Sequence, residues 1–327
     1  MKSVAIIVYE DAFLSAMAAI IDLLTTTNQL LRKEGRPPAF KLILVGVDND
    51  KVMLEWRSQF DCQKTLAEVQ NADLVIIPAF KGDRDPMKVL AKNEAVVPWL
   101  QRMYAQGSEV ASLCFGAYFL AEAGLLNGKN YTSHWLAMEE LKKRYPKAKV
   151  KPDAVLTDEE GIYTGGGGFS SLNLLSYIIS KFCGRSIALK LSKLFSIDLD
   201  RVTQSHFFVF QGQRRHNDQE IHNAQTIIEK NYKEITVGEV AEQLPMSKRS
   251  FIRRFKKSTQ YTPQEYLQRV KVEAAKKMLE REGKHIKEVM YEVGYTDLKF
   301  FGKMFKKYTN LTPTAYGRKY RRILASV

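Results

Sequence analysis

The sequence predicts an α/β domain built around a mostly parallel sheet, followed by an all-α domain with two helix-turn-helix units in tandem. Three observations predict this division. Strand-like and helix-like stretches alternate over residues 1–195, whereas no period-two pattern follows residue 223. Residues 251–266 return as residues 301–316, where eight of the sixteen positions carry the same amino acid. The repeat indicates that one structural element is used twice.

The expected elements of the α/β domain follow in order. Residues 3–9 form a β-branched run that is typical of a strand buried on both faces. Further strands are expected at residues 40–47, 74–79, 109–113, 131–134 and 162–164. Helices are expected at residues 13–31, 94–106, 116–123, 170–182 and 186–195. The alternating order favours a sheet sandwiched between layers of helices.

Positive charge is concentrated in the C-terminal third of the chain. The 327 residues carry 50 Lys and Arg against 36 Asp and Glu, a net charge of +14, and residues 212–327 account for +12 of it. A basic part beside a nearly neutral one indicates a polyanionic partner for the first and a different ligand for the second. The polar residues 196–221 are the predicted linker between a domain of residues 1–195 and one of residues 222–322.

The cysteine pattern and the apolar runs favour a cytoplasmic protein. Cys62, Cys114 and Cys183 have neither metal-ligand spacing nor the pattern of a disulfide framework, which fits a reducing compartment. The first nine residues are typical of a strand rather than a signal peptide. No run of about 18 apolar residues is found in the sequence. We therefore expect no metal, no cofactor and no membrane span.

The two helix-turn-helix units are expected at residues 236–257 and 286–307. In each unit a supporting helix and a turn lead to a second helix, which begins after a good N-cap, Ser247 or Asp297. The side chains expected to face the two small cores are Phe251, Ile252, Phe255, Phe301 and Phe305. A connecting helix expected at residues 263–282 would hold the two units about one turn of DNA, ~34 Å, apart.

Side chains on the outer faces of the second helices are the candidate DNA contacts. A helix fits the major groove of B-DNA, where guanine O6 and N7 accept hydrogen bonds from Arg or Lys. The predicted DNA-binding residues are Lys248, Arg249, Arg253, Lys256, Lys257, Lys299, Phe300, Lys303, Lys306 and Lys307. The later lysines of each helix are expected at phosphates, whereas Phe300 either contacts thymine methyl groups or packs. The alternative is an amphipathic helix with a solvated basic face.

A spaced set of residues in and after the second unit matches a known pattern. The set consists of Ile286, Val289, Val293, Gly294, Tyr295, Asp297, Phe301, Phe305, Lys306, Lys307, Thr312, Pro313 and Tyr316. With these residues, the chain resembles the AraC-type transcription regulators over about residues 222–322. The resemblance implies that double-stranded DNA is the partner of this part.

A cysteine lies where a strand is expected to meet a helix. Cys114 has the position of the residue in a nucleophile elbow, and the helix behind it is expected to lower the pKa of its thiol. His134 and Glu10 are expected at the ends of other strands, on the sheet edge where ligands of open α/β sheets bind. Gly166 and Gly167 belong to a run of four glycines whose backbone N–H groups can hold a ligand.

The residues around this cysteine and histidine match a second known pattern, at residues 112–128 and 132–135. With them, residues 1–195 resemble the PfpI/ThiJ-like branch of the class I glutamine amidotransferase superfamily, which implies a flavodoxin-like parallel-sheet sandwich. Joined to an AraC-type C-terminus, they resemble the GlxA-like regulators. In that family the N-terminal domain is thought to sense small, often nitrogen-containing metabolites and to help dimerisation.

The second resemblance implies Cys114 as the elbow residue, Glu10 as the acid of the first strand and His134 as the nearby imidazole. Two departures count against catalysis. Phe115 stands where hydrolytic relatives often have His, and no His with an acidic partner occurs near residues 160–175. We therefore expect no enzymatic activity. The expected ligand pocket is lined by Glu10, Cys114, Phe115, His134, Gly166 and Gly167.

Three functions are consistent with the sequence. The first is a homodimeric transcription regulator that binds a small effector and double-stranded DNA, with RNA polymerase as a further candidate partner. The second is a cysteine-dependent enzyme of the amidase or deglycase type with an accessory DNA-binding module, in which Cys114, His134 and Glu10 would be catalytic. The third is a basic architectural or RNA-binding protein with weak sequence preference.

Overall fold

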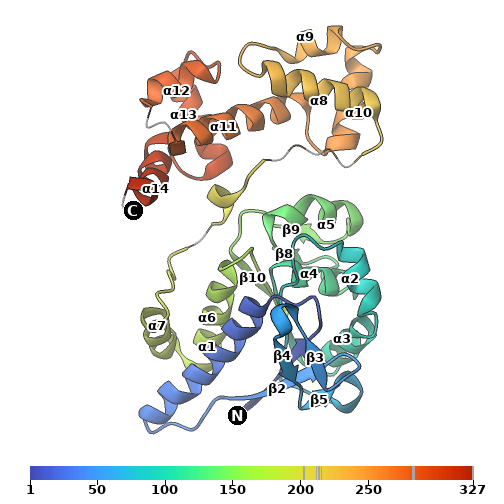
Figure 1. The fold of residues 1–327 in the computed structure, drawn as a ribbon, viewed down its shortest axis with the longest axis vertical. Coiled ribbons are helices and arrows are strands. Elements are labelled where there is room, and N and C mark those ends of the chain that lie inside the picture. The colour runs from blue at the N-terminus through green and yellow to red at the C-terminus, as the bar shows by residue number, and fades with distance from the viewer. Residues whose placement is uncertain (202, 211, 213, 215, 282–283, 326–327) are drawn as a thin grey trace. The chain divides into compact units, whose positions relative to one another are not determined.

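The computed structural model describes residues 1–325 apart from Val202, Gln211, Gln213, Arg215, Glu282 and Gly283. The chain separates into two compact units, Met1–Gln204 and Ser205–Val327 (Figure 1). The first unit is an α/β sandwich and the second is built from helices, which confirms the predicted fold class.

A seven-stranded sheet forms the centre of the first unit. Its strands are β1 (Lys2–Val8), β2 (Phe40–Gly46), β5 (Lys64–Thr65), β6 (Leu74–Ile77), β7 (Glu109–Leu113), β10 (Leu156–Glu159) and β11 (Ile162–Gly165). Their order is β10-β11-β7-β6-β1-β2-β5, and each neighbouring pair is parallel except β10 with β11. The carboxyl ends of β1, β7 and β11 therefore lie at the same edge of the sheet, as the sequence predicts for its candidate site.

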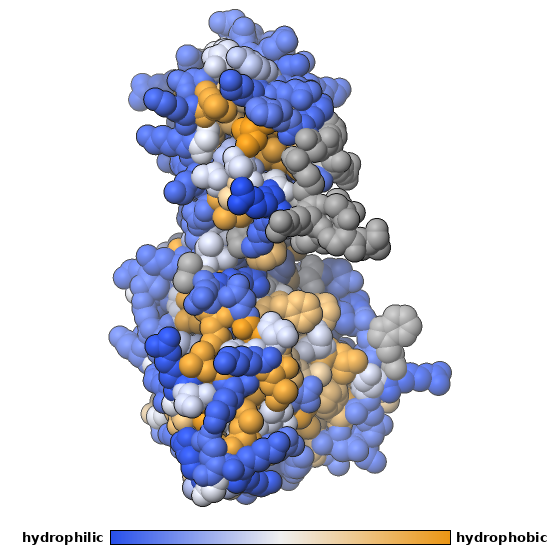
Figure 2. Space-filling model, turned by 90° about the vertical axis from the view of Figure 1, so that its left-hand side faces the viewer, coloured by the Kyte–Doolittle hydropathy of each residue, from blue (hydrophilic) through white to orange (hydrophobic). Residues whose placement is uncertain are grey.

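Helices cover both faces of this sheet. Figure 1 shows α1 (Leu14–Lys33), α6 (Ser170–Cys183) and α7 (Arg185–Leu194) on one side. On the other side lie α2 (Pro86–Lys92), α3 (Val96–Ala105) and α4 (Ala117–Glu122). Figure 2 shows that apolar side chains also gather on the outer surface of the first unit over α1, α6 and α7.

α1 combines length with an apolar composition. It is 20 residues long and apolar enough, by length and composition alone, to cross a membrane. Met17, Ile20, Leu23 and Leu24 are nevertheless buried in the unit, and the helix packs against α6, α7 and β2. α1 is a core helix of the α/β unit. Its Ala and Thr positions interrupt the large apolar residues, so the stretch looks amphipathic in the sequence.

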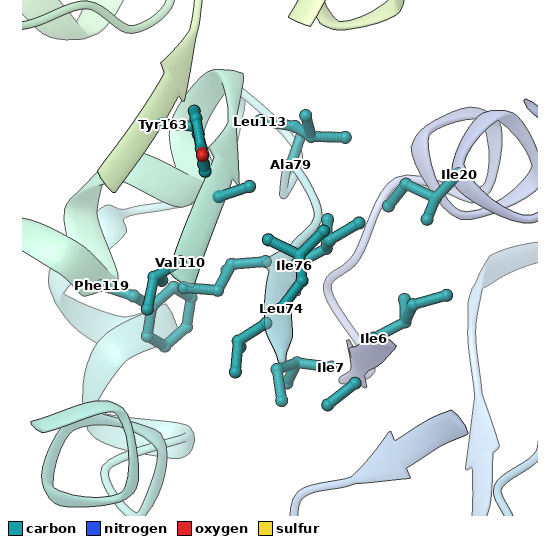
Figure 3. Close-up of a cluster of buried hydrophobic side chains, with 14 of the residues drawn as sticks. Ile6, Ile7, Ile20, Leu74, Ile76, Ala79, Val110, Leu113, Phe119 and Tyr163 are labelled. Carbon is teal, nitrogen blue, oxygen red and sulfur yellow. The ribbon is translucent and has the colours of Figure 1, made fainter. Parts of the chain in front are cut away.

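The core lies between the sheet and its helix layers. Figure 3 shows Ile20 of α1 on one side of Ile6 and Ile76, and Phe119 of α4 on the other. All four side chains are fully buried. Because β1 is covered on both faces, its sequence is continuously apolar rather than alternating.

The strands and helices predicted for the first unit are confirmed with small shifts of their ends, with one exception. Of the strand expected at residues 131–134, only Tyr131 belongs to a strand, β8 (Asn130–Tyr131). The next residue leaves the strand because the N–H of Thr132 donates to Thr164 Oγ1 at 2.7 Å. The short elements without a prediction are β3 (Lys51–Met53), β4 (Gln59–Asp61), β5, β9 (Lys149–Val150), β10, α2 and α5 (Met138–Arg144).

The second unit contains two similar groups of helices. They are α8 (Gln219–Asn231), α9 (Val237–Glu242), α10 (Lys248–Thr259), α11 (Pro263–Arg281), α12 (Ile286–Glu292), α13 (Leu298–Thr309) and α14 (Pro313–Ala325). The connecting helix α11 packs against the three helices before it and the three after it, so both groups share it. The predicted helix at residues 263–282 is thereby confirmed as far as Arg281, and Glu282 lies outside the described residues.

The segment expected as a linker, residues 196–221, is divided between the two units. Gln204 is buried in the first unit, whereas Phe208 and Phe210 pack into the first helical core of the second. Val202, Gln211, Gln213 and Arg215 of this segment lie outside the described residues. The predicted domain bounds at residues 195 and 222 stay a prediction, while the compact units divide between Gln204 and Ser205.

Candidate nucleic-acid interface and ligand site

Polar residues fix both ends of α10. Ser247 Oγ accepts a hydrogen bond from the N–H of Ser250 at 3.3 Å, and Gln260 closes the helix in the left-handed conformation with φ +66°. Phe251 and Phe255, four residues apart, are fully buried. The core therefore fixes one face of α10 and leaves the opposite face to solvent.

The exposed face of α10 carries the predicted DNA contacts of the first helix-turn-helix. They are Lys248, Arg249, Arg253, Lys256 and Lys257, all of them exposed. Together with Ile252 and Gln260 they line a shallow hollow on the helix surface. A row of exposed cations on a rigid helix is the electrostatic pattern of a nucleic-acid contact.

The sequence predicted that Ile252 faces the core, and this prediction is wrong. The residue is 37% exposed among these basic side chains. One residue beyond Phe251 is a rotation of about 100° around the helix, which carries Ile252 out of the buried stripe. Its apolar character suggested burial. In the exposed position it offers the kind of surface that contacts a thymine methyl group.

One arginine of α10 is used inside the unit. Arg254 donates two hydrogen bonds to Asp218, at 3.0 and 2.7 Å. Asp218 also caps α8 by accepting from the N–H of Ile221 at 3.3 Å. The hydrogen bonds from Arg254 hold the pKa of the Asp218 carboxyl below its ordinary value. Arg254 thus fixes α10 on α8 rather than belonging to the free basic face.

α13 has the same arrangement fifty residues later. Asp297 Oδ1 accepts a hydrogen bond from the N–H of Phe300 at 2.9 Å, and Asn310 closes the helix with φ +57°. Phe301 and Phe305 are fully buried. The predicted DNA contacts on its exposed face are Lys299, Phe300, Lys303, Lys306 and Lys307.

The aromatic side chain of Phe300 both packs and stays accessible. Its ring lies 5.8 Å from that of Tyr295, yet the residue is 47% exposed. Of the two roles predicted for Phe300, packing is therefore present in the structure. Contact with DNA remains a prediction.

The turn before α13 requires glycine at position 294. Gly294 has φ +74°, and a Cβ atom there would overlap the carbonyl oxygen of Lys233. Lys271 Nζ donates to Gly294 O at 3.1 Å, which binds the turn to α11. The orientation of α13 is thereby fixed relative to the connecting helix.

The same tyrosine contact holds the helix that follows each helix-turn-helix. Tyr266 of α11 donates to Glu229 of α8 at 2.5 Å, and Tyr316 of α14 donates to Glu280 of α11 at 2.5 Å. Both phenol rings are buried against the phenylalanines of their cores. The sequence repeat is therefore also a repeat of packing.

In the α/β unit, Cys114 has the conformation of an elbow residue. It follows β7 directly and has φ +55°, which few residues other than glycine adopt. Its thiol accepts from the backbone N–H groups of Gly168 and Phe115, but burial dominates and raises the pKa to about 11. The expectation that the following helix lowers this pKa is wrong, because desolvation of the thiolate outweighs the two N–H groups.

His134 and Phe115 form a stacked pair next to this cysteine. Their rings are 5.1 Å apart and nearly parallel, at 13°. His134 Nδ1 accepts from the N–H of Leu136 at 3.1 Å, which leaves the proton of the neutral imidazole on Nε2. Burial lowers the pKa of His134 to about 4. The side chain is therefore uncharged at neutral pH.

Glu10 lies at the same sheet edge but is directed to the surface. In the described part of the chain, both its hydrogen bond and its ion pair are with Lys92. The residue next to it, Tyr9, is buried. Burial is the largest cause of its raised pKa, followed by the charges of Asp11 and Cys114. The structure therefore brings Cys114, Phe115 and His134 together, and Tyr9, directly after β1, interacts electrostatically with Cys114.

The backbone N–H groups of the glycine run are already engaged. Gly166 donates to Val155 O at 2.8 Å, and Gly167 donates to Gln204 Oε1 at 3.1 Å. Gln204 was not predicted, because it lies in the polar segment 196–221, which carries no motif of a site. Among the described residues, no group of three or more His, Cys, Asp or Glu side chains is placed to hold a metal ion.

Known families match both units of the chain. Residues 13–180 match the DJ-1/PfpI family, and residues 240–319 match a helix-turn-helix domain. The HTH-type transcriptional regulator GbdR of Pseudomonas aeruginosa is 23% identical over 314 residues, which cover 95% of this chain and 83% of GbdR. The HTH-type transcriptional regulator GlxA of Rhizobium meliloti is 23% identical over 228 residues, which cover 67% of this chain and 68% of GlxA.

A solved structure supports the fold. The crystal structure of an AraC family transcriptional regulator from Pseudomonas putida matches with a TM-score of 0.51 at 19% identity, over 60% of this chain and 100% of the other. The two family matches follow in the order of the two units, and GbdR matches across both. The chain therefore belongs to the AraC-family transcription regulators, with a DJ-1/PfpI domain in front of a DNA-binding helix-turn-helix domain.

Proposed function

We propose that this regulator reads DNA with α10 and α13 and changes its DNA occupancy when a small effector binds beside Cys114 and His134. It acts in the cytoplasm as a homodimer. One observation carries the DNA part of the proposal: two capped helices, fifty residues apart, each bury phenylalanines on one face and expose basic side chains on the other.

The early and late residues of each helix have different roles. Arg249 and Arg253 of α10 contact base edges, because Arg engages guanine through two hydrogen bonds. Lys256 and Lys257, one turn later, bind phosphates and set the register, and Lys248 joins them at the start of the helix.

α13 reads a different half-site. Lys299 and Lys303 stand where α10 has arginines, and Lys is a point charge without the planar fork of Arg. Ile252 of α10 is matched by Gly302, so α13 lacks the apolar contact at that place. Phe300 supplies an aromatic contact of its own, and Lys306 and Lys307 bind phosphates.

The effector part rests on the neutral surroundings of Cys114. The imidazole of His134 is uncharged, Phe115 provides an aromatic wall, and burial keeps the thiol protonated. Gly166 and Gly167 form a further wall without side chains, and Glu10 takes part from the exposed rim. A protonated, buried thiol is a weak nucleophile, which supports binding rather than catalysis.

The homodimer uses the outer surface of α1 and α7. Leu189 and Leu194 of α7 are exposed there, on a helix that contacts α1. Grouped apolar side chains at a surface are typical of interaction sites. At a promoter the regulator also meets RNA polymerase, which is the fourth partner of this proposal after DNA, the effector and a second copy.

Selection of a DNA site from a random pool by the full chain, followed by fluorescence anisotropy, tests the DNA part. Arg253→Ala should weaken binding to the selected site about 10- to 100-fold, or 1–3 kcal/mol, and relax the preference at one base position. Lys143→Ala removes an exposed lysine from α5, outside the proposed DNA and dimer surfaces, and should leave binding unchanged. An equal loss on selected and random DNA would contradict base reading by Arg253.

A thermal-shift screen of amines, amino acids and aldehydes on the full chain tests the effector part. A compound that binds the folded chain raises the unfolding midpoint by mass action. The shift should be much smaller in Phe115→Ala, and the compound should change the affinity for the selected DNA site. Unchanged DNA affinity at a saturating concentration would rule out the compound as an effector.

A further inference from the structure

The side chain of Gln204 fills a polar cradle in the first unit. It is only 2% exposed. Its Oε1 atom accepts from the N–H of Gly167 at 3.1 Å. The acceptors around its Nε2 atom are Thr132 Oγ1 at 3.1 Å, Ser133 O at 3.0 Å, Pro152 O at 3.1 Å and Ala154 O at 3.1 Å. Both ends of the carboxamide are therefore matched by the protein.

The polarity of this cradle is set by the backbone. The N–H of Gly167 can only donate, and the carbonyl groups of Ser133, Pro152 and Ala154 can only accept. A carboxylate in the same place would direct an oxygen at these three carbonyl oxygens. An ammonium group would leave the buried N–H of Gly167 without an acceptor, which costs free energy. The cradle is thus complementary to a primary carboxamide.

The cradle shares its walls with the site around Cys114. Ser133, which accepts from Gln204 through its carbonyl, donates from its hydroxyl to Cys114 O at 2.7 Å. A Cβ atom at Gly167 would overlap the His134 ring, and one at Gly166 would lie 2.8 Å from Gln204 Oε1. The glycines therefore let the imidazole and the carboxamide approach the same stretch of backbone.

We propose that the cradle is a binding subsite for primary carboxamides, that the chain's own Gln204 occupies it, and that a small molecule with such a group competes with Gln204. The proposal rests on the effector site proposed above, of which the cradle is one wall. Gln204 reaches the cradle from residues 198–200, which are exposed. Thr203 pairs with Ala154 in a β-bridge, and the N–H of Gln204 donates to Asp153 O at 3.0 Å. A competing ligand therefore has to offset these backbone contacts as well as the hydrogen bonds of the Gln204 side chain.

Displacement of Gln204 would reach the DNA-binding unit through the chain itself. The next residue, Ser205, accepts in the second unit from Asn310, the residue that closes α13, at 2.8 Å. Gln204 and Ser205 are thus neighbouring anchors, one in each unit. Release of Gln204 from the cradle lengthens the free chain before Ser205. Ligand binding in the cradle therefore changes how the DNA-binding unit is tethered.

Chemical complementation of the full chain tests the subsite. Gln204→Ala removes the carboxamide and leaves space for acetamide. Near saturation, acetamide should raise the unfolding midpoint of Gln204→Ala by about 3 °C. Acetate and acetone, which have the same size but lack the N–H groups, should not. The same shift with all three compounds, or none with acetamide, would overturn the subsite.

Hydrogen exchange of the wild-type chain gives a second measurement that needs no variant. The backbone N–H of Gln204 donates to Asp153 O at 3.0 Å and is protected while the side chain is in the cradle. Saturating acetamide should speed its exchange, whereas acetate should not, and equal exchange in both would contradict the competition. Neither measurement involves DNA or an effector. Failure of the effector screen therefore removes the proposed function alone, and failure with acetamide removes the subsite alone.

Discussion

Cys114 combines the geometry of a nucleophile elbow with a thiol that burial keeps protonated. With its pKa raised to about 11, about one thiol in ten thousand is ionised at pH 7. We expect iodoacetamide to alkylate Cys114 slowly at neutral pH, with a rate that rises up to about pH 11. Mass spectrometry of the peptide that contains Cys114 measures this rate, with the urea-unfolded chain as control. A half-maximal rate near pH 7 would instead indicate a catalytic thiolate.

His134 links the stability of the first unit to pH. Because its pKa is lowered from 6.5 to about 4, the unfolded chain binds a proton between these values that the folded chain does not. Its stability contribution is therefore complete above about pH 6.5 and is lost as the pH falls through about 4. We expect His134→Phe, which keeps an aromatic ring on Phe115, to abolish this loss, which a shift of this size puts at about 3 kcal/mol.

Chemical unfolding of the wild-type chain and of His134→Phe between pH 4 and pH 8 measures the effect. The comparison is of pH dependence, because the variant also loses the acceptor for the N–H of Leu136 and is less stable at every pH. Parallel stability curves for the two proteins would show that His134 is not the titrating group.

At the scale of elements, two glycines of the second unit make opposite predictions. Gly294→Ala would place a Cβ against Lys233 O at φ +74°, so we expect a loss of about 2 kcal/mol or more in the stability of this unit. Gly302 lies within α13, and a Cβ there meets nothing within 4 Å. Gly302→Ala should therefore stabilise the helix by about 0.5–1 kcal/mol.

Thermal unfolding and DNA binding of the two variants separate structure from contact. Gly294→Ala should lower the midpoint of the second unit and weaken DNA binding, because α13 loses its fixed orientation. Gly302→Ala should raise the midpoint. If Gly294→Ala leaves both the midpoint and DNA binding unchanged, the turn at residue 294 has no special role in holding α13.

The helices were predictable because their periodicity is strong, and the errors occur where periodicity has little resolution. Phe251 and Phe255 define the buried stripe of α10, but the pattern does not decide on which side of that stripe Ile252 lies. The strand expected at residues 131–134 ends early because of a hydrogen bond to Thr164, a residue more than thirty positions away. Short edge elements such as β5 have too few residues to show a period at all.

For the candidate site, the sequence located residues but not their environment. The elbow conformation of Cys114 follows from a local motif and is present. The direction of its pKa shift depends on burial by distant segments, which no local pattern contains. Gln204 was missed for the same reason, since each of its side-chain partners is at least 37 positions away in the sequence.

At the scale of the whole molecule, charge and periodicity were enough to separate the two units, because one is basic and helical and the other nearly neutral and α/β. The division between Gln204 and Ser205 was not visible. It depends on two anchors, the cradle around Gln204 and the hydrogen bond from Asn310 to Ser205. In the proposed regulation, the two units influence each other through these two neighbouring residues.

The proposed homodimer also belongs to this scale. Leu194 of α7 is 64% exposed, and Leu189 is exposed on the same helix. A glutamate at the centre of an apolar interface would be buried without a partner, which is costly. We therefore expect Leu194→Glu to raise the dimer dissociation constant at least about 10-fold, as measured by sedimentation velocity. Met53→Glu, at an exposed position of β3, serves as the control and should sediment like the wild type.

Because two linked DNA-binding units bind two half-sites with a gain in avidity, Leu194→Glu should also weaken binding to a double site more than to a single one. Identical sedimentation of the wild type and Leu194→Glu would contradict a dimer through α1 and α7.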